Sequence, residues 1–189
     1  MKSWDVIIVG GGIIGLSLSI ALKTSGLRVL IIERGEPGHE ASRAAAGMLA
    51  SEAFENLSPL RDLARASAEM YPEFVHELQD ESGIHVDLRT QGSLDFSSTH
   101  GVDAEAEIIS PANLRDLEPS LPEAVGTAHY LSERSVDPRQ LVSAALQTAK
   151  HRKVDISSGT TVVEILLADG RVSGVRTENT SYSASTVVN

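Results

Sequence analysis

The stretch that decides the fold is Asp5-Val-Ile-Ile-Val-Gly-Gly-Gly-Ile-Ile-Gly15. Its first five residues, Asp5–Val9, form a short apolar run rich in β-branched side chains, which is typical of a strand buried on both faces of a parallel sheet. The run ends at glycine, and Gly10, Gly12 and Gly15 then form a G-x-G-x-x-G element. The pattern predicts a strand, a tight glycine turn and a helix, in that order.

A second strand and an acidic residue follow this element at the spacing of a dinucleotide-binding unit. Ser25-Gly26 closes the predicted helix, and the apolar strand Arg28–Ile32 is followed directly by Glu33. A carboxylate at this place, roughly 20 residues beyond the glycines, binds the hydroxyls of an adenosine ribose and disfavours a 2′-phosphate. The alternative is a glycine-rich contact between helix and sheet in another α/β fold, but it leaves Glu33 unexplained.

Each glycine of the turn has its own physical role. Gly10 permits the sharp turn out of the strand, Gly12 lets the backbone approach a pyrophosphate, and Gly15 lets the helix lie close to the sheet. The free N–H groups at the start of the helix, with the positive end of its dipole, then attract the phosphates.

Composition narrows the class of partner. The 189 residues are 41% hydrophobic and 22% charged, as in a globular protein of one domain or slightly more. A formal net charge of −10 disfavours a nucleic-acid partner or an anionic membrane surface, so we expect a small-molecule ligand. The chain has no cysteine, which excludes a disulfide framework and a thiol nucleophile, and its six histidines lack the paired spacing of a metal site.

The apolar run Val6–Leu22 raises the question of a signal peptide. Its glycines interrupt the run, and a second strand resumes after it without a clear cleavage site. No segment has the roughly 18 apolar residues of a membrane span. We therefore expect a cytoplasmic protein.

A stretch of small residues further along, Glu40-Ala-Ser-Arg-Ala-Ala-Ala-Gly-Met-Leu49, has two interpretations. On composition alone it begins an alanine-rich helix with Ser42 as a possible N-cap. Together with the glycine turn and Glu33-Arg34, however, it resembles the D-amino-acid-oxidase-like family of FAD-dependent oxidoreductases. The nearest likeness within that family is to the glycine-oxidase branch of thiamine biosynthesis.

This resemblance implies an α/β fold, with a Rossmann-like FAD-binding domain built from a parallel sheet and a β-meander. Part of an α+β substrate domain is added to it. The FAD-binding domain is expected at residues 1–83 and 135–189, and the partial substrate domain at 84–134. Between Phe96 and Ile108 the chain is shorter than the family pattern, which leaves less room for one wall of the substrate pocket.

The resemblance also assigns residues to a non-covalently bound FAD. The glycines are joined at the pyrophosphate by Ile13 and Ile14, and Arg34 joins Glu33 at the ribose. A backbone contact to the adenine is assigned to Val162. The residues assigned to the flavin side are Ala41, Ser42, Ala46, Gly47 and Met48.

The activity that the resemblance implies is oxidative deamination of glycine or a similar small amino acid or amine, with oxygen as the electron acceptor and hydrogen peroxide as a product. A sarcosine-oxidase-like enzyme and a D-amino-acid dehydrogenase, which would use another acceptor, are alternatives. So are a non-catalytic FAD-binding fragment and, more weakly, an NAD-dependent reductase. No residue is an evident general acid or base, so no catalytic residue is assigned.

The chain ends at Asn189, where the family pattern continues into the rest of the substrate domain. We therefore expect the apolar strand Tyr182–Val188 to form an exposed sheet edge that promotes self-association, with a homo-oligomer as one outcome.

Several local signals complete the predicted architecture. Ser58-Pro59 begins a long helix that Gly83 ends, with Met70 and Phe74 on its core-facing stripe. Ser110-Pro111 and Asp137-Pro138 begin two more helices, and the basic run Lys150–Lys153 is interpreted as a solvated end of the last one. The strands expected after it are Val154–Ile156, Thr160–Leu167, Arg171–Thr177 and Tyr182–Val188, with a hairpin turn at Asp169-Gly170.

Overall fold

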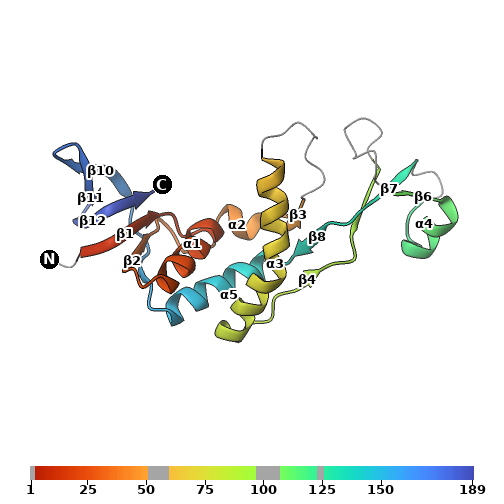
Figure 1. The fold of residues 1–189 in the computed structure, drawn as a ribbon, viewed down its shortest axis with the longest axis horizontal. Helices are drawn as coiled ribbons and strands as arrows, with labels where there is room; N and C mark the ends of the chain where they lie inside the picture. The colour runs from red at the N-terminus through yellow and green to blue at the C-terminus, as the bar shows by residue number, and fades with distance from the viewer. Residues whose placement is uncertain (1–2, 51–59, 97–106, 123–125) are drawn as a thin grey trace. The chain divides into compact units, whose positions relative to one another are not determined.

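The computed structural model describes residues 3–50, 60–96, 107–122 and 126–189, which fall into two compact units (Figure 1). The first unit comprises Met1–Ala46, His76–Val86 and Asp137–Asn189, and the second comprises Gly47–Val75 and Asp87–Val136. Residues 47–75 thus cluster with the second unit. The assignment of residues 1–83 with 135–189, and of 84–134, to two domains of separate function stays a prediction.

A six-stranded sheet forms the centre of the first unit, in the order β10-β11-β12-β1-β2-β9. β1 runs parallel to β2 and β12, and β2 runs parallel to β9, whereas β10, β11 and β12 form an antiparallel meander. The strands are β1 (Ser3–Val9), β2 (Val29–Ile32), β9 (Asp155–Ser157), β10 (Val162–Ala168), β11 (Arg171–Thr177) and β12 (Ser181–Val188). The predicted parallel sheet and meander are both present.

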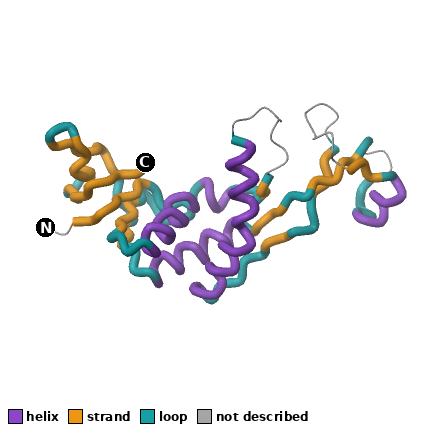
Figure 2. Tube along the Cα trace, viewed as in Figure 1, coloured by secondary structure: helices purple, strands orange, loops and turns teal. Residues whose placement is uncertain are grey.

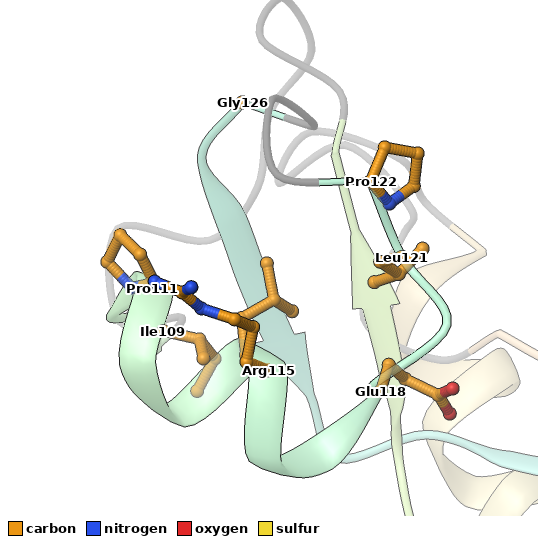
Figure 3. Close-up of a pocket in the computed structure, with 8 residues that line it drawn as sticks. Ile109, Pro111, Arg115, Glu118, Leu121, Pro122 and Gly126 are labelled. Atoms are coloured by element: carbon orange, nitrogen blue, oxygen red, sulfur yellow. The ribbon is translucent and has the colours of Figure 1, made fainter.

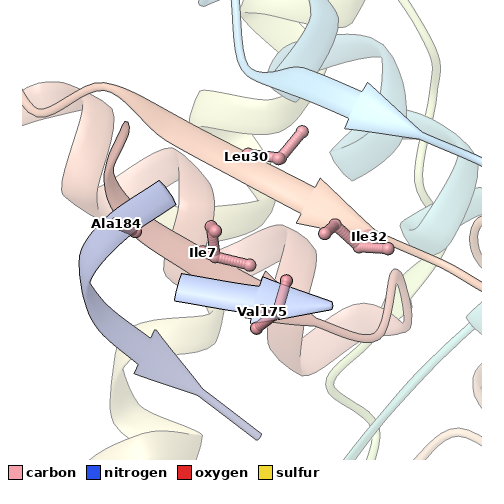
Figure 4. Close-up of a cluster of buried hydrophobic side chains, with 5 residues drawn as sticks. All are labelled: Ile7, Leu30, Ile32, Val175 and Ala184. Carbon is pink, nitrogen blue, oxygen red and sulfur yellow. The ribbon is translucent and has the colours of Figure 1, made fainter. Parts of the chain in front are cut away.

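The two faces of this sheet are covered by different elements. Ile7 of β1 pairs with Leu30 of β2, and Ile8 pairs with Ile31, so the two pairs point to opposite faces. A Cβ added at Gly15 would lie 3.3 Å from the Ile8 side chain, which shows that Ile8 faces the helix that begins with the glycine turn. The opposite face carries a buried cluster (Figure 4) made of Ile7, Leu30, Ile32, Val175 and Ala184. Val175 belongs to β11 and Ala184 to β12, so the meander contributes two side chains to this cluster.

The meander confirms the predicted hairpin and corrects one prediction about the sheet edge. Asp169 and Gly170 have φ angles of 50° and 74°, as a two-residue turn between β10 and β11 requires. β12, however, pairs with β11 on one side and with β1 on the other. The prediction of an exposed edge at Tyr182–Val188 was therefore wrong, because the end strands of this sheet are β10 and β9.

Four helices contribute to the first unit. They are α1 (Ile13–Thr24), α2 (Ala41–Ala44), α5 (Pro138–His151) and the C-terminal turns of α3 (Arg61–Ser82). α5 begins as predicted, because the Asp137 side chain accepts hydrogen bonds from the backbone N–H groups of Arg139 and Gln140. Gly83, with φ of 70°, follows the last turn of α3 as predicted. The predicted helix start at Ser58-Pro59 lies outside the described residues.

The basic end of α5 is solvated as predicted at Lys150, His151 and Lys153, but not at Arg152. The Arg152 side chain is only 18% exposed. Its guanidinium contacts α1 and α3, two helices that are far from Arg152 in the sequence. Its hydrogen-bond partners are Glu77, Glu81, the Thr24 hydroxyl and the Ile20 carbonyl oxygen.

The buried face of α3 also differs from the prediction. Met70 is 69% exposed, whereas Val75 and Leu78 are buried together with Ala68. Phe74 is half-buried and contacts Tyr71 edge to face, with ring centroids 6.3 Å apart. Met70 is therefore not part of the core face, whereas Phe74 is partly buried and the fully buried positions of α3 are Ala68, Val75 and Leu78.

In its described residues, the second unit contains two three-stranded sheets, the helix α4 (Pro111–Leu117) and the N-terminal turns of α3 (Figure 2). The first sheet consists of β3 (Met48–Leu49), β8 (Arg134–Val136) and β4 (Leu88–Arg89), and the second of β5 (Ser93–Asp95), β7 (Ala128–Leu131) and β6 (Glu107–Ile109). α4 begins as predicted, with the Ser110 hydroxyl accepting from the Asn113 N–H. Among the described residues, no helix combines the length and the apolar character needed to cross a membrane.

Candidate functional site

The glycine turn lies at the edge of the sheet where the parallel strands β1, β2 and β9 all end. Ligands of open α/β sheets bind at this carboxyl edge. The Gly10 N–H donates to the Ile32 carbonyl oxygen at 2.9 Å, which joins the end of β1 to the end of β2. Gly10 has φ of 108°, a conformation that side chains with a Cβ rarely adopt. The turn therefore needs glycine at its first position.

The glycine turn has no room for a side chain at Gly15, where it meets α1, but there is open space beside Gly10. A Cβ added at Gly15 would lie less than 3.0 Å from the Gly10 carbonyl oxygen, so the start of α1 packs directly on the turn. A Cβ added at Gly10 would meet nothing within 4 Å. The first turn of α1 contains no acidic residue that would repel an anion. This arrangement leaves backbone N–H groups accessible to a phosphate.

Glu33 is held against this turn by two backbone hydrogen bonds. Its residue exposure is 9%, which is low for a carboxylate. Oε2 accepts from the Gly11 N–H at 2.7 Å, and Oε1 accepts from the Gly35 N–H at 2.8 Å. The carboxylate therefore links the glycine turn to the loop after β2, at the position where the sequence predicts a ribose contact.

The loop after β9 lies beside Glu33. The Glu33 N–H donates to the Ser157 carbonyl oxygen at 2.9 Å, and the Thr160 N–H donates back to the Glu33 carbonyl oxygen at 2.9 Å. These bonds bring the residues just before β10 to the predicted ribose position. Val162, the predicted adenine contact, is two residues further on and packs partly buried against the core cluster.

Ser42 touches the glycine turn and is not a helix N-cap, which was the alternative interpretation from composition alone. It lies inside the short helix α2, whose N-cap residue is Glu40. The Ser42 hydroxyl accepts the backbone N–H of Ile13 at 3.0 Å, and a Cβ added at Gly12 would lie 3.0 Å from the same oxygen. The structure thus brings Ser42 to the start of α1.

Arg34 is bound to a residue that the sequence did not assign to the site. Its guanidinium donates to Glu40 through Nε at 3.1 Å and through Nη2 at 2.7 Å. These hydrogen bonds lower the pKa of Glu40 and raise the pKa of Arg34. His39 on the same loop is exposed, and its Nδ1 lies 3.2 Å from Glu36 Oε2.

The remaining predicted residues are spread over both units. Ile14, at the pyrophosphate turn, is 82% exposed. Ala41 is the first residue of α2, and Ala46 follows that helix in the first unit. Gly47 and Met48 belong to the second unit, where Met48 pairs with Ser135 between β3 and β8.

The structure adds four positions to the site residues assigned from the sequence: Gly11, Gly35, Gly38 and Thr160. Gly11, Gly35 and Thr160 bind Glu33 through their main-chain N–H groups. Every residue type except proline has such a group, so the residue types at these positions did not reveal the contacts. Because these three N–H groups all bind Glu33, they hold its carboxylate beside the open glycine turn. The turn and the carboxylate together form a cradle that fits the pyrophosphate and ribose of a dinucleotide.

Gly38 packs against α5 on the loop that follows Glu33, and we expect Gly38→Ala to destabilise the folded chain. Gly38 has φ of 80°, and a Cβ there would lie less than 3.0 Å from the buried Val142 side chain of α5. Strain and overpacking together should lower the free energy of unfolding by about 2–4 kcal/mol. Urea unfolding followed by circular dichroism and by the fluorescence of Trp4, the single tryptophan of the chain, measures the loss.

Gly35→Ala is the matched control for this prediction. Gly35 lies on the same loop, but a Cβ there would be 3.8 Å from its nearest neighbour, Glu33 Oε1. The control should therefore change stability by less than about 0.5 kcal/mol. Equal losses in the two variants would contradict the role assigned to Gly38.

The second unit has a small hollow of its own beside α4 (Figure 3). It is lined by Ile109, Pro111, Leu114, Arg115, Glu118, Leu121, Pro122 and Gly126. Six of these eight residues are apolar or glycine, and the two charged ones are Arg115 and Glu118. Within the described ranges, no group of three or more histidine, aspartate or glutamate residues is placed to hold a metal ion.

Comparison with known proteins agrees with this geometry. The chain is 35% identical over 192 residues to the bifunctional protein ThiO/ThiG of Synechocystis, a match that covers 97% of this chain and 29% of that protein. It is 29% identical over 198 residues to the glycine oxidase of Bacillus licheniformis, covering 99% of this chain and 54% of that enzyme. The crystal structure of glycine oxidase from Geobacillus kaustophilus superposes with a TM-score of 0.90 at 28% identity, over 99% of this chain and 55% of that one.

The chain thus spans about half the length of the glycine oxidases that it matches. The superposition confirms the predicted fold class. A family model described as FAD dependent oxidoreductase (DAO) matches residues 5–189, which favours a flavin over the nicotinamide of the alternative reductase. From these matches and the geometry of the glycine turn, we conclude that the chain belongs to the FAD-dependent oxidoreductase (DAO) family.

Proposed function

We propose that the chain binds FAD at the carboxyl edge of its parallel sheet and serves the oxidation of glycine or another small amino acid or amine. The observation that carries this proposal is the buried Glu33 carboxylate, held to the Gly11 N–H at 2.7 Å. This bond supports the proposal because it holds the carboxylate proposed to accept the ribose hydroxyls next to the turn proposed to bind the phosphates. The family membership supports FAD, and the glycine oxidases among the relatives support the substrate class.

The residues of the cradle have separate tasks in this proposal. Gly10, Gly12 and Gly15 bring the backbone of the turn close to the pyrophosphate, which is assigned to the N–H group of Ile14 and to that of Ile13 in exchange for its hydrogen bond to Ser42. Glu33 accepts hydrogen bonds from the ribose hydroxyls, with Arg34 beside it, and the backbone at Val162 contacts the adenine. The flavin side is assigned to Ala41, Ser42, Ala46, Gly47 and Met48.

Bound FAD supplies hydride abstraction from the α-carbon of the amine, with release of an imine that water hydrolyses to an oxo acid and ammonia, and reduction of oxygen to hydrogen peroxide. The described residues bind and orient, and none of them is proposed as a general acid or base. Because the chain spans about half of the glycine oxidases, the complete reaction is the part of the proposal that most needs a direct assay.

The assay of the activity uses the chain loaded with FAD. We expect hydrogen peroxide and ammonia to form from glycine, and hydrogen peroxide and methylamine from sarcosine, in equal amounts with the oxygen consumed. Turnover only with a quinone or a dye as acceptor would favour the dehydrogenase alternative. Retained FAD without turnover with any acceptor would contradict the proposed activity and leave the chain as a flavin-binding module.

Glu33→Gln tests the carboxylate on which the proposal rests. A glutamine amide has one acceptor oxygen and one NH2 donor, so it cannot accept both backbone N–H groups, and one of them loses its partner. We expect the affinity for FAD to fall by about 10- to 100-fold, together with a loss of stability. Titration of flavin fluorescence against protein concentration measures the affinity.

Glu36→Gln is the control for the Glu33 variant. It removes the same charge from the same loop, at an exposed carboxylate that pairs with His39. The control should leave FAD affinity within about twofold of the original chain. If both variants weaken binding equally, only net charge matters and the role of Glu33 is refuted.

A further inference from the structure

Arg34 and Glu33 make opposite demands on a nucleotide. In dinucleotide-binding folds, an acid at the end of the second strand selects a free ribose 2′-hydroxyl, whereas an arginine nearby accommodates a 2′-phosphate. This chain has both residues, next to each other at the end of β2. A positively charged guanidinium at this place would reduce the selectivity that Glu33 provides.

Glu40 removes this conflict. Two hydrogen bonds, at 3.1 and 2.7 Å, join its two carboxylate oxygens to the Arg34 guanidinium. Such a two-point contact fixes the orientation of the guanidinium and neutralises its charge more effectively than a single contact does. The Arg34 and Glu40 side chains are 67% and 60% exposed, so a ligand in solution can compete for Arg34.

The other charges around Arg34 do not take over this role. The Glu33 carboxylate is already bound to the Gly11 and Gly35 N–H groups. Glu36 lies 3.2 Å from His39, and the Arg43 guanidinium lies 3.5 Å from the other ring nitrogen of that histidine. Glu40 is the carboxylate that the Arg34 guanidinium binds with two hydrogen bonds.

We propose that Glu40 is a specificity-determining residue of the nucleotide site, which occupies Arg34 and so excludes ligands with a 2′-phosphate. The inference rests on the proposed function, because it concerns the ribose end of the same dinucleotide site. The site then rejects a 2′-phosphate in two ways: Glu33 repels the phosphate directly, and Glu40 withholds the cation that would bind it.

The test compares two probes that differ only in the group concerned, ADP-ribose and 2′-phospho-ADP-ribose. Their affinities for the chain are measured by isothermal titration calorimetry at low salt, for the original sequence and for Glu40→Gln. We expect the substitution to strengthen binding of the 2′-phosphorylated probe by about 3- to 10-fold, the size expected when one exposed two-point ion pair is released. Binding of ADP-ribose should change by less than about twofold.

Two further variants identify the residue responsible for the gain. Glu36→Gln removes the same charge from the same loop without freeing Arg34, so it should shift both probes equally and by less than about twofold. Adding Arg34→Gln to Glu40→Gln should abolish the gain, because the released guanidinium is then missing.

Three results would overturn the inference. The first is an equal gain in Glu36→Gln, and the second is a gain in Glu40→Gln that survives the loss of Arg34. The third is an unchanged ratio of the two affinities in Glu40→Gln. If no variant binds ADP-ribose at all, the proposed dinucleotide site fails and this inference fails with it, a result that the measured ADP-ribose affinity distinguishes from the other three.

Discussion

Gly15→Ala should abolish retention of FAD by this chain. A methyl group at this position would lie less than 3.0 Å from the Gly10 carbonyl oxygen, and a backbone atom cannot rotate away as a side chain can. The turn must therefore open, which moves the N–H groups at the start of α1 away from the pyrophosphate. We expect the affinity to fall by roughly 100-fold or more and stability to fall by about 1–3 kcal/mol from overpacking.

Helix propensity alone predicts a change of stability in the opposite direction for Gly15→Ala. Replacing glycine by alanine inside a helix normally stabilises it by about 1 kcal/mol, so a loss of stability requires the steric clash. Ser17→Ala, two positions along α1, is the control and should retain FAD. Flavin absorption after desalting and urea unfolding monitored by Trp4 fluorescence measure the two effects. A Gly15→Ala chain that keeps FAD and gains stability would contradict the geometry of the turn.

Arg152→Ala should produce the largest loss of stability among surface-charge changes in the first unit. The guanidinium is 18% exposed and donates to groups on α1 and α3, so its removal leaves two carboxylates and the Ile20 carbonyl oxygen with fewer partners. We expect the free energy of unfolding to fall by about 2–4 kcal/mol. Lys150→Ala, an exposed lysine near the end of the same helix, should cost less than about 0.5 kcal/mol.

The same ion pair predicts a dependence of stability on pH. Hydrogen bonding from Arg152 lowers the pKa of Glu81 below its ordinary value of 4.5. A carboxylate whose pKa is lower in the folded chain stabilises the fold fully above the unfolded pKa, and this contribution is lost as pH falls through the folded pKa. The difference in unfolding free energy between the original chain and Arg152→Ala should therefore shrink below about pH 4.5. A difference that stays constant down to pH 2 would show that Arg152 acts by packing alone.

Local sequence signals predicted those elements whose structure depends on neighbouring residues. The glycine turn with β1, α1 and β2 needs only backbone conformation and apolar runs, both of which are visible in the sequence. The start of α5 at Asp137 and the hairpin at Asp169-Gly170 are equally local, because capping and turn geometry act over two to four residues. These elements include the centre of the candidate site.

Features that depend on distant partners were not predictable in this way. The burial of Arg152 requires α1, α3 and α5 to meet at one point, and periodicity within one helix does not contain that information. The exposure of Met70 has the same origin, since two stripes of α3 carry apolar residues and tertiary packing selects between them. In the candidate site, the hydrogen bonds between Ser42 and Ile13 and between Glu40 and Arg34 likewise depend on the folded path of the chain and not on a local sequence pattern.

The visible absorption spectrum of the purified 189-residue chain, recorded after mixing with excess FAD and desalting, tests the central claim most directly. The account predicts that bands of oxidised flavin remain with the protein at close to one FAD per chain, and that Glu33→Gln and Gly15→Ala lose them. A folded chain that elutes without flavin would contradict the claim that this glycine turn and Glu33 together hold the cofactor.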